Sequence, residues 1–269
     1  MIVSHQHRFV FLHNPKAGGT SVRRTLEKFS DSSERFFLND PDPQSLLHRV
    51  DRAHIGLEEF VRYYPEVWSR CEAYAFFALW RAPRARMFSS LQEYSRHFAQ
   101  TDIRFLSPPK RRDFLMSTID MLHSHGTAEN ILESFELTHF RPQWIYLEAP
   151  NGVPVVTSFS LSEIESLFKE IGARVGEPDL RPEASENASE RLALPAGLSG
   201  VLANNRRKMM IRAIPGVPLL ISLARKVLVH QPRLDPRTMF ALSEADIKTV
   251  DGFLADFYKQ DFERLPLAG

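Results

Sequence analysis

The stretch RFVFLHNPKAGGTS, residues 8–21, decides the fold that the sequence predicts. Its first part is an apolar run that ends at Asn14 and Pro15. Because a proline cannot continue a central sheet ladder, residues 8–13 are expected to form a buried strand that ends here. A lysine, two glycines and two hydroxyl residues follow, and residues 20–29 then carry apolar side chains at helical spacing. The stretch therefore predicts a strand, a tight loop and a helix in direct succession.

The same alternation of strand and helix recurs further along the chain. Residues 73–80 are aromatic and apolar without alternation, as expected for a central strand that is covered on both faces, and a helix is predicted over 84–98. Another strand is predicted over 153–159, followed by an amphipathic helix over 161–171 that ends at Gly172. Strands that alternate with helices predict an α/β fold with a central parallel sheet and helices on both faces.

Shorter patterns give the remaining predicted elements. These are strands at 36–38 and 52–56 and helices at 57–63, 111–123, 128–135 and 243–258, the last of which starts with a Ser-x-x-Asp pattern at Ser243 and Asp246. Residues 101–109 are polar and contain prolines, which indicates a loop, and residues 177–200 are rich in Pro, Ser and Glu, which indicates an extended one.

Composition limits the classes of protein that this chain can belong to. With 269 residues and 43% hydrophobic content it can bury a full core, and its 34 Lys and Arg nearly balance its 33 Asp and Glu. This balance predicts no nucleic-acid partner. Cys71 is the only cysteine, which excludes an intramolecular disulfide and a Cys-rich metal cluster, and it is expected to be buried. The polar start, without a charged-then-apolar leader, predicts a cytoplasmic protein.

Residues 206–229 combine a basic cluster with an apolar run. The apolar part contains two prolines, an arginine and a lysine, and it falls short of the ~20 apolar residues that a membrane span needs. We therefore expect no transmembrane segment, although the segment is compatible with peripheral contact at a membrane surface.

The loop after the first predicted strand has the composition of an anion site. Its glycines allow backbone N–H groups to turn toward one point at a helix N-terminus, while the lysine adds a charge and the hydroxyls add donors. The residues concerned are Lys16, Ala17, Gly18, Gly19, Thr20 and Ser21. The order differs from the nucleotide loop Gly-x-x-x-x-Gly-Lys-Ser/Thr, because Lys16 precedes both glycines.

Two motifs together carry a resemblance to a known family. The string His13-x-Pro15-Lys16-x-Gly18-Gly19-Thr20-Ser21 resembles the 5′-phosphosulfate loop of sulfotransferases that use 3′-phosphoadenosine 5′-phosphosulfate (PAPS), in the form found in the family-2 branch related to the Golgi carbohydrate sulfotransferases. Arg81, just after the predicted central strand, and Ser89, in the next helix, are similar to the family's 3′-phosphate motif. Arg81 would grip the phosphate and Ser89 would donate to it.

The resemblance continues in two further segments. Residues 141–147 (RPQWIYL) are similar to a Pro-Gln-x-x-Tyr-Leu patch of the family, and Asn187 to Arg191 are similar to a late segment that closes over the nucleotide. The resemblance thus implies a single P-loop-like sulfotransferase domain over 1–269. In it, 1–191 would be the cofactor-binding α/β core with a helical lid at 101–150, and 192–269 a helical C-terminal part.

What the resemblance implies for the reaction is transfer of a sulfuryl group from PAPS to a hydroxyl, which leaves 3′-phosphoadenosine 5′-phosphate. Lys16 is expected to stabilise the leaving group, and no metal is required. His54 lies between the two motifs in a context similar to the catalytic histidine of related carbohydrate enzymes, and an imidazole can accept the proton of the acceptor hydroxyl. Glu58 and Glu59 are the alternatives for this base.

The acceptor and the alternative functions stay open at the level of the sequence, whereas a zinc site is not expected. The acceptor is a carbohydrate, a lipid or a secondary metabolite, that is, a small molecule or glycan with a hydroxyl group. A P-loop-like nucleotide kinase and a non-catalytic nucleotide-binding protein are the alternative functions. His123 and His125 flank a serine, but no third ligand accompanies them at a recognisable spacing, so we expect no zinc site.

Overall fold

The computed structural model describes residues 1–34, 36, 51–99, 101–148, 155–183 and 236–265. The chain divides into two compact units. The first comprises Met1–Met87, His125–Ser185 and Leu254–Gly269, and the second comprises Phe88–Ser124 and Glu186–Phe253. The residues expected to form a helical lid, 101–150, are thus divided between the units at Ser124.

The first unit contains a four-stranded mixed sheet in the order β1-β2-β3-β4. Its strands are β1 (Ile2–Ser4), β2 (Phe9–Leu12), β3 (Ala75–Trp80) and β4 (Val156–Ser160). β2, β3 and β4 are parallel to their neighbours, as predicted, and β3 is a central strand. The expectation of a wholly parallel sheet was wrong, because β1 pairs antiparallel with β2. Only residues 5–8 join these two strands, and so short a connection permits only an antiparallel pair.

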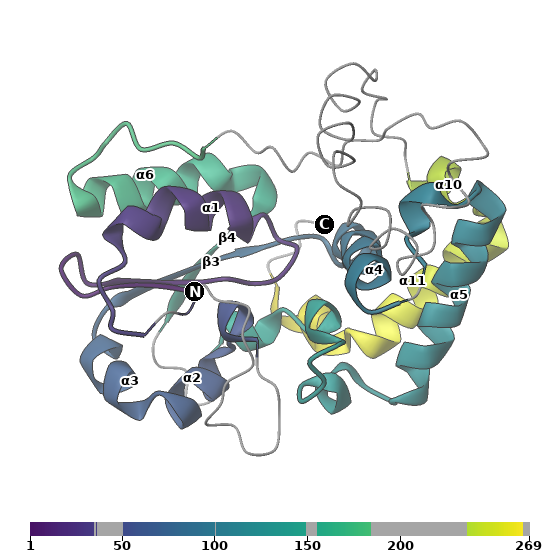
Figure 1. Cartoon of the computed structure of the whole chain (residues 1–269), viewed down its shortest axis with the longest axis horizontal. Coiled ribbons are helices and arrows are strands. Elements are labelled where there is room, and N and C mark those ends of the chain that lie inside the picture. The colour runs from purple at the N-terminus through teal and green to yellow at the C-terminus, as the bar shows by residue number, and fades with distance from the viewer. Residues whose placement is uncertain (35, 37–50, 100, 149–154, 184–235, 266–269) are drawn as a thin grey trace, which may run out of the picture. The chain divides into compact units, whose positions relative to one another are not determined.

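Helices cover both faces of this sheet (Figure 1). α1 (Gly19–Leu26) and α6 (Ile164–Val175) lie on one face, and α2 (Leu57–Tyr63) and α3 (Pro65–Cys71) lie on the other. Side chains of successive strand residues alternate between these faces. Phe9 and Phe11 of β2 therefore pack with Val22 and Phe168 under α1 and α6.

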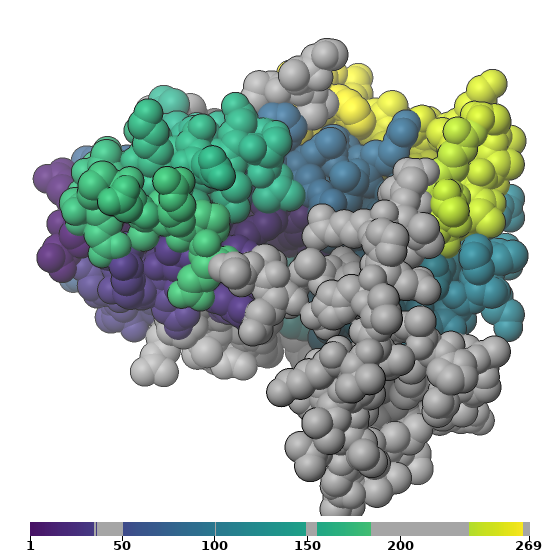
Figure 2. All heavy atoms as spheres, turned by 90° about the horizontal axis from the view of Figure 1, so that it is seen from above, coloured from purple at the N-terminus to yellow at the C-terminus, as the bar shows by residue number. Residues whose placement is uncertain are grey.

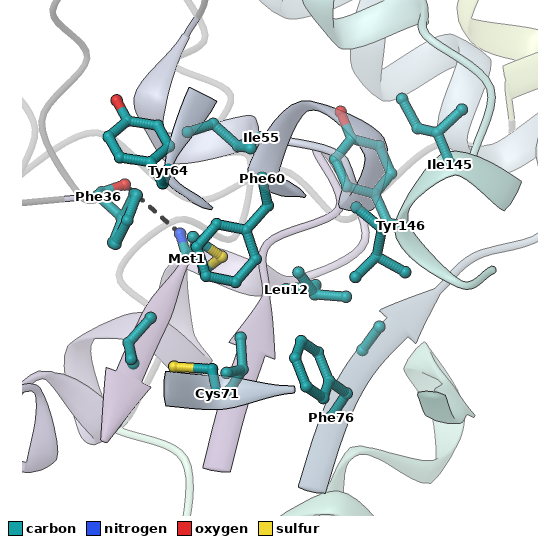
Figure 3. Close-up of a cluster of buried hydrophobic side chains, with 14 residues drawn as sticks. Met1, Leu12, Phe36, Ile55, Phe60, Tyr64, Cys71, Phe76, Ile145 and Tyr146 are labelled. Atoms are coloured by element: carbon teal, nitrogen blue, oxygen red, sulfur yellow. Dashed lines mark hydrogen bonds between the residues drawn. The ribbon is translucent and has the colours of Figure 1, made fainter. Parts of the chain in front are cut away.

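The opposite face of the sheet supports the second apolar core (Figure 3). Here Leu12 of β2 and Phe76 of β3 pack against Phe60 of α2 and Tyr146, and all four side chains are buried. Cys71 lies in this core with no exposed surface, as predicted, and its burial raises the pKa of the thiol to about 12. The amino group of Met1 donates to the carbonyl of Ala53 at the edge of the same core.

Seen from above, α6 and the residues that follow it lie beside α1 (Figure 2). The Lys28 ammonium, just past α1, contacts the Glu177 carboxylate at 2.6 Å across this boundary, and both side chains are about half exposed. α6 continues past Gly172, the predicted end, to Val175, and the left-handed Gly176 terminates it. Gly172 is instead packed, because a Cβ there would lie 2.4 Å from the Glu177 carbonyl.

The second unit is helical in the part that the structure describes. α4 (Pro83–His97) enters it from the first unit after Met87, and α5 (Pro108–Ser124), α10 (Pro236–Met239) and α11 (Glu244–Phe257) follow. Arg112 of α5 holds Asp246 of α11 through two hydrogen bonds of 2.8 and 2.6 Å. Ser243 and Asp246 cap α11 reciprocally, as their spacing predicted. No helix in the described ranges is long and apolar enough to cross a membrane.

Two short elements differ from the prediction. Residues 52–56, predicted as a strand, contain the 3₁₀ turn Arg52–His54, because the Asp51 side chain accepts from the Ala53 N–H and caps a turn. Residues 128–135, predicted as a helix, form only the 3₁₀ turn Ala128–Ile131. A 3₁₀ turn, Ile103–Phe105, also lies inside the predicted loop 101–109. Some predictions concern residues that lie outside the described ones. These are residues 37–38 of a predicted strand, residues 184–200 of the predicted extended loop, which include Arg191, and residues 206–229.

Candidate functional site

The candidate site lies at the carboxyl edge of the sheet. Leu12 of β2 pairs with Ala78 of β3, and Trp80 of β3 pairs with Ser160 of β4, so the three parallel strands end side by side. The loop after β2 (residues 13–19, the first loop, whose last residue also begins α1) and the loop after β3 (residues 81–82, the second loop) therefore emerge next to each other. This edge is where open α/β sheets bind their ligands.

The first loop turns sharply before α1 begins. Lys16 and Gly18 have positive φ angles of 63° and 86°, and Gly18 is the N-cap residue of α1. Gly18 provides no capping side chain, and the first turn carries no acidic residue. The first-turn N–H groups of α1, including those of Thr20 and Ser21, thus form a helix N-terminus with the polarity that favours an anion.

The glycines of the first loop also permit close approach by other side chains. A Cβ on Gly19 would lie 1.9 Å from Cδ2 of His13, so the imidazole packs directly on the glycine backbone. A Cβ on Gly18 would lie 2.4 Å from Cδ1 of Leu161. Gly18 is therefore needed for both packing and conformation, and Gly19 is needed for packing.

The second loop contacts the first through side chains of the predicted 3′-phosphate motif. Nη1 of Arg81 donates to the carbonyl of Lys16 at 3.3 Å, which brings the two predicted motifs together. Nε of Arg86, on the first turn of α4, donates to the carbonyl of Pro15 at 3.0 Å. Ser89 lies on the second turn of α4, beyond Met87, and belongs to the second unit.

His54 lies under the first loop and has a defined tautomer. Its Nδ1 lies 2.9 Å from the carbonyl of His13, which can only accept, so Nδ1 carries the proton and Nε2 is the acceptor. Nε2 lies 3.9 Å from Oδ2 of Asp51. The His54 ring centroid is 4.3 Å from that of His13 and 5.5 Å from that of His139. Three imidazoles therefore gather beside the first loop.

Burial determines the protonation of this histidine cluster. The pKa of His54 is lowered to about 3, mainly by removal of the imidazole from water and in part by nearby positive charges that include Lys16 and Arg141. The same desolvation holds the pKa of His13 well below its usual range, and a proton on His54 would lower this pKa further. Desolvation also raises the pKa of Asp51. His54 is therefore neutral at physiological pH, with its Nε2 lone pair able to accept a proton.

The two alternative bases have other contacts. Both carboxylate oxygens of Glu59 contact Nη1 of Arg141, at 3.0 and 3.1 Å, and one of them also accepts from the Gly56 N–H. Glu58 is exposed and faces Arg62 on the next turn of α2. The geometry therefore favours His54 over either glutamate as the proton acceptor.

The remaining predicted site residues are Ala17 and Arg191. Ala17 is a buried residue of the first loop. Arg191 lies outside the described residues. His123 and His125 lie at the end of α5 and just beyond it, and among the described residues no group of three potential ligands could hold a metal ion.

Sequence reasoning missed several residues that support the site. They are Asn14, Asp51, Arg86, His139 and Gln143. Gln143 had a signal, because it lies in the Pro-Gln segment that resembles the family, and Asn14 directly follows a predicted strand. Nothing in the spacing of the others indicates that they approach the loops.

Comparison with family models, with curated proteins and with solved structures found no match to this chain. The function proposed below therefore depends on the residues and on the geometry that has just been described.

Proposed function

We propose that this chain is a PAPS-dependent sulfotransferase that transfers a sulfuryl group to a hydroxyl of a carbohydrate, a lipid or a secondary metabolite. The observation that carries the proposal is the contact between Arg81 and the Lys16 carbonyl at the carboxyl edge of the sheet. It joins a loop suited to a 5′-phosphosulfate with a loop suited to a 3′-phosphate. A nucleotide with a phosphate at each end would occupy both loops at once.

The residues fit such a nucleotide in charge and in donor type. Its 5′ end would face Lys16 and the N-terminus of α1, where backbone N–H groups favour an anion. Arg81 would bind the 3′-phosphate through its planar guanidinium.

In the proposed reaction the acceptor oxygen attacks the sulfur in line with the leaving group. The bond between sulfur and the bridging oxygen breaks, and its electron pair stays with the 5′-phosphate of the departing 3′-phosphoadenosine 5′-phosphate. Lys16 would stabilise the charge that develops on this bridging oxygen. The acceptor proton would pass to Nε2 of His54, whose other nitrogen is fixed by the His13 carbonyl.

The low pKa of His54 bears on this role. It keeps the imidazole neutral, but it also reduces the driving force for proton transfer. Because the bound phosphates would add negative charge beside Lys16, one of the cations that lower this pKa, the nucleotide would raise the pKa of His54. The base would therefore become stronger when the cosubstrate binds.

Binding of the product nucleotide tests the proposal against the kinase alternative. Thermal unfolding is measured with 3′-phosphoadenosine 5′-phosphate and, separately, with ATP and Mg²⁺. At ~100 times its Kd, a ligand that binds only the folded state stabilises it by about 2.7 kcal/mol. We expect this stabilisation from the bisphosphate. Stabilisation by ATP alone would contradict the proposal.

Turnover separates the enzyme from a non-catalytic nucleotide-binding protein. Labelled PAPS is incubated with a panel of hydroxyl-bearing acceptors, and transfer is compared between the wild type and His54→Asn. The asparagine amide retains a donor for the His13 carbonyl but is not a base. We expect transfer by the wild type and its loss in the variant, whereas unchanged transfer would remove His54 from the mechanism.

A further inference from the structure

The side-chain amide of Gln143 bonds to both loops of the candidate site. The residue is fully buried, and it follows Arg141 and Pro142 on the segment that precedes the 3₁₀ turn Trp144–Tyr146. Its Oε1 accepts from the Arg81 N–H at 3.0 Å, and its Nε2 donates to the Arg81 carbonyl at 2.8 Å. The amide therefore pairs with both backbone groups of Arg81, as a neighbouring strand would.

The same oxygen reaches the first loop. Oε1 of Gln143 also accepts from Nδ2 of Asn14 at 3.0 Å, and this Nδ2 donates in addition to the carbonyl of Leu79 on β3, likewise at 3.0 Å. Asn14 is 1% exposed and lies directly between β2 and Lys16. The two buried amides of Asn14 and Gln143 thus connect the first loop, two residues before Lys16, with Arg81, the residue that begins the second loop.

The buried carboxylate of Asp261 holds the backbone of Gln143. Oδ1 of Asp261, on α12 (Lys259–Arg264), accepts from the N–H of Gln143 at 2.7 Å and from that of Trp144 at 2.9 Å. Asp261 has no exposed surface. The segment is held a second time by Arg86, which donates from Nη2 to the carbonyl of Arg141 at 2.6 Å and from Nε to that of Pro15 at 3.0 Å.

We infer that Gln143 is a positioning residue that sets the separation of the two phosphate loops and thereby gives the site its preference for a nucleotide phosphorylated at both the 5′ and the 3′ positions. This inference rests on the proposed function, because it assigns the two loops to the two ends of one ligand. Gln143 itself need not touch the nucleotide.

The physical reason is preorganisation. A ligand that spans two loops gains both sets of contacts only where their separation already matches its own length, and a misplacement of about 1 Å can cost ~10²-fold. Without the amide, the N–H and carbonyl of Arg81 and the amide of Asn14 would lose buried partners, which drives the loops to shift or to admit water. A ligand that uses one loop alone is insensitive to this separation.

The test therefore compares ligands with one and with two phosphates. Dissociation constants are measured by calorimetry for 3′-phosphoadenosine 5′-phosphate, adenosine 5′-phosphate and adenosine 3′-phosphate. The proteins are the full-length wild type, Gln143→Met, which keeps the length of the side chain without its hydrogen bonds, and Gln143→Glu, which keeps both acceptor contacts. Gln143→Glu provides the same comparison if Gln143→Met fails to fold.

We expect the wild type to prefer the bisphosphate over either monophosphate. In Gln143→Met this preference falls ~10-fold, while the affinity for each monophosphate changes by no more than ~3-fold. Gln143→Glu keeps the acceptor contacts but turns its second carboxylate oxygen toward the Arg81 carbonyl, so a repulsive contact replaces that bond and the preference falls in the same direction. Ile171→Ala is the control, because it opens a cavity in the apolar core under α6 and removes no hydrogen bond of either loop, so it should lower stability but leave the preference unchanged.

The two possible failures are distinguishable. If the wild type prefers the bisphosphate and both Gln143 variants retain that preference in full, the inference about Gln143 is wrong and the proposed function stands. If the wild type shows no preference for the bisphosphate, the proposed function itself is wrong, and the inference fails with it. A loss of preference in Ile171→Ala as large as that in Gln143→Met would also overturn it, since general destabilisation would then explain the effect.

Discussion

The two loops at the carboxyl edge of the sheet are fixed in different ways. The first loop is shaped locally, by the left-handed backbone of Lys16 and Gly18 and by the close packing of His13 on Gly19. The second loop is held by Gln143, a residue from a distant part of the chain whose amide pairs with the backbone of Arg81. Substitutions within the first loop should therefore change turnover and the stability of the local backbone. The position of the second loop should instead depend on residues that are distant in sequence, such as Gln143.

Replacement of the lysine in the first loop should have the largest effect. Lys16→Met keeps the length of the side chain but removes the charge that is assigned to the leaving group, and we expect turnover to fall ~10²- to 10³-fold. The measurement is the rate of sulfate transfer from PAPS at saturating acceptor.

The matched control is Lys28→Met, just past α1. The Lys28 side chain is 53% exposed and pairs with Glu177 away from the site, so its removal should leave turnover near the wild-type value. Equal losses in the two variants would show that general electrostatics, and not the position of Lys16, determines the rate.

A methyl group in the first loop tests the close approach of His13. In Gly19→Ala the new Cβ would collide with Cδ2 of the buried imidazole, so His13 must move, and we expect the free energy of unfolding to fall by about 2 kcal/mol. Chemical denaturation provides the measurement.

Gly252→Ala is the matched control, because this glycine lies within α11 and a Cβ there meets nothing within 4 Å. Alanine in a helix interior is favoured over glycine by about 0.5–1 kcal/mol. The two substitutions should therefore change stability in opposite directions, and a stabilised Gly19→Ala would contradict the close packing of His13.

The dependence of the free energy of unfolding on pH tests whether the pKa of His54 in the histidine cluster is lowered. The folded pKa of His54 is about 3 and the unfolded pKa is near the ordinary 6.5. Between these values the unfolded chain binds a proton that the native chain does not, so stability is lost as the pH falls. One such group contributes a slope of up to about 1.4 kcal/mol per pH unit.

His54→Asn should remove this contribution. His13, whose pKa is also lowered, makes stability fall as the pH falls, as His54 does. Asp51, whose pKa is raised, makes stability rise as the pH falls toward its ordinary pKa. The comparison with the variant therefore isolates the contribution of His54. Urea unfolding of both proteins at about pH 7 and about pH 5 gives the two slopes. Identical slopes would mean that His54 is exposed to water and titrates normally.

The smallest effect concerns the response of His54 to the nucleotide. Because phosphates beside Lys16 add negative charge, 3′-phosphoadenosine 5′-phosphate should raise the pKa of His54 from about 3. An NMR titration of the imidazole with and without the nucleotide measures the shift. A pKa that does not move would place the phosphates away from this cluster.

The contrast between the loops also explains what the sequence could predict. β2, the first loop and α1 are formed by one continuous stretch of sequence. Its apolar run, its proline and its glycines determine the local backbone, so this unit was predicted correctly. β3 and α4 were predicted for the same reason, and the parallel pairing of β2, β3 and β4 is confirmed, whereas the short strand β1, which was not predicted, pairs antiparallel with β2. The turn at Arg52–His54 was missed, because it is stabilised by the side chain of Asp51, which the periodicity of apolar residues does not reveal.

The supports of the second loop could not be predicted by such local reasoning. Gln143 and Asp261 are far from Arg81 in sequence, and only the folded chain brings their buried hydrogen-bonding groups together. The sequence suggested the polar residues that would face a ligand, Lys16 and Arg81, through a resemblance in which each motif is local. The contact between Arg81 and the Lys16 carbonyl, which brings the two motifs together, could not be predicted from either motif alone.

The most direct test of the central claim, that the two loops form one site for a nucleotide with two phosphates, is a crystal structure of the chain with 3′-phosphoadenosine 5′-phosphate. The account predicts the 5′-phosphate at Lys16 and the N-terminus of α1, and the 3′-phosphate at Arg81. A nucleotide bound elsewhere, or one whose 3′-phosphate points away from Arg81, would contradict it.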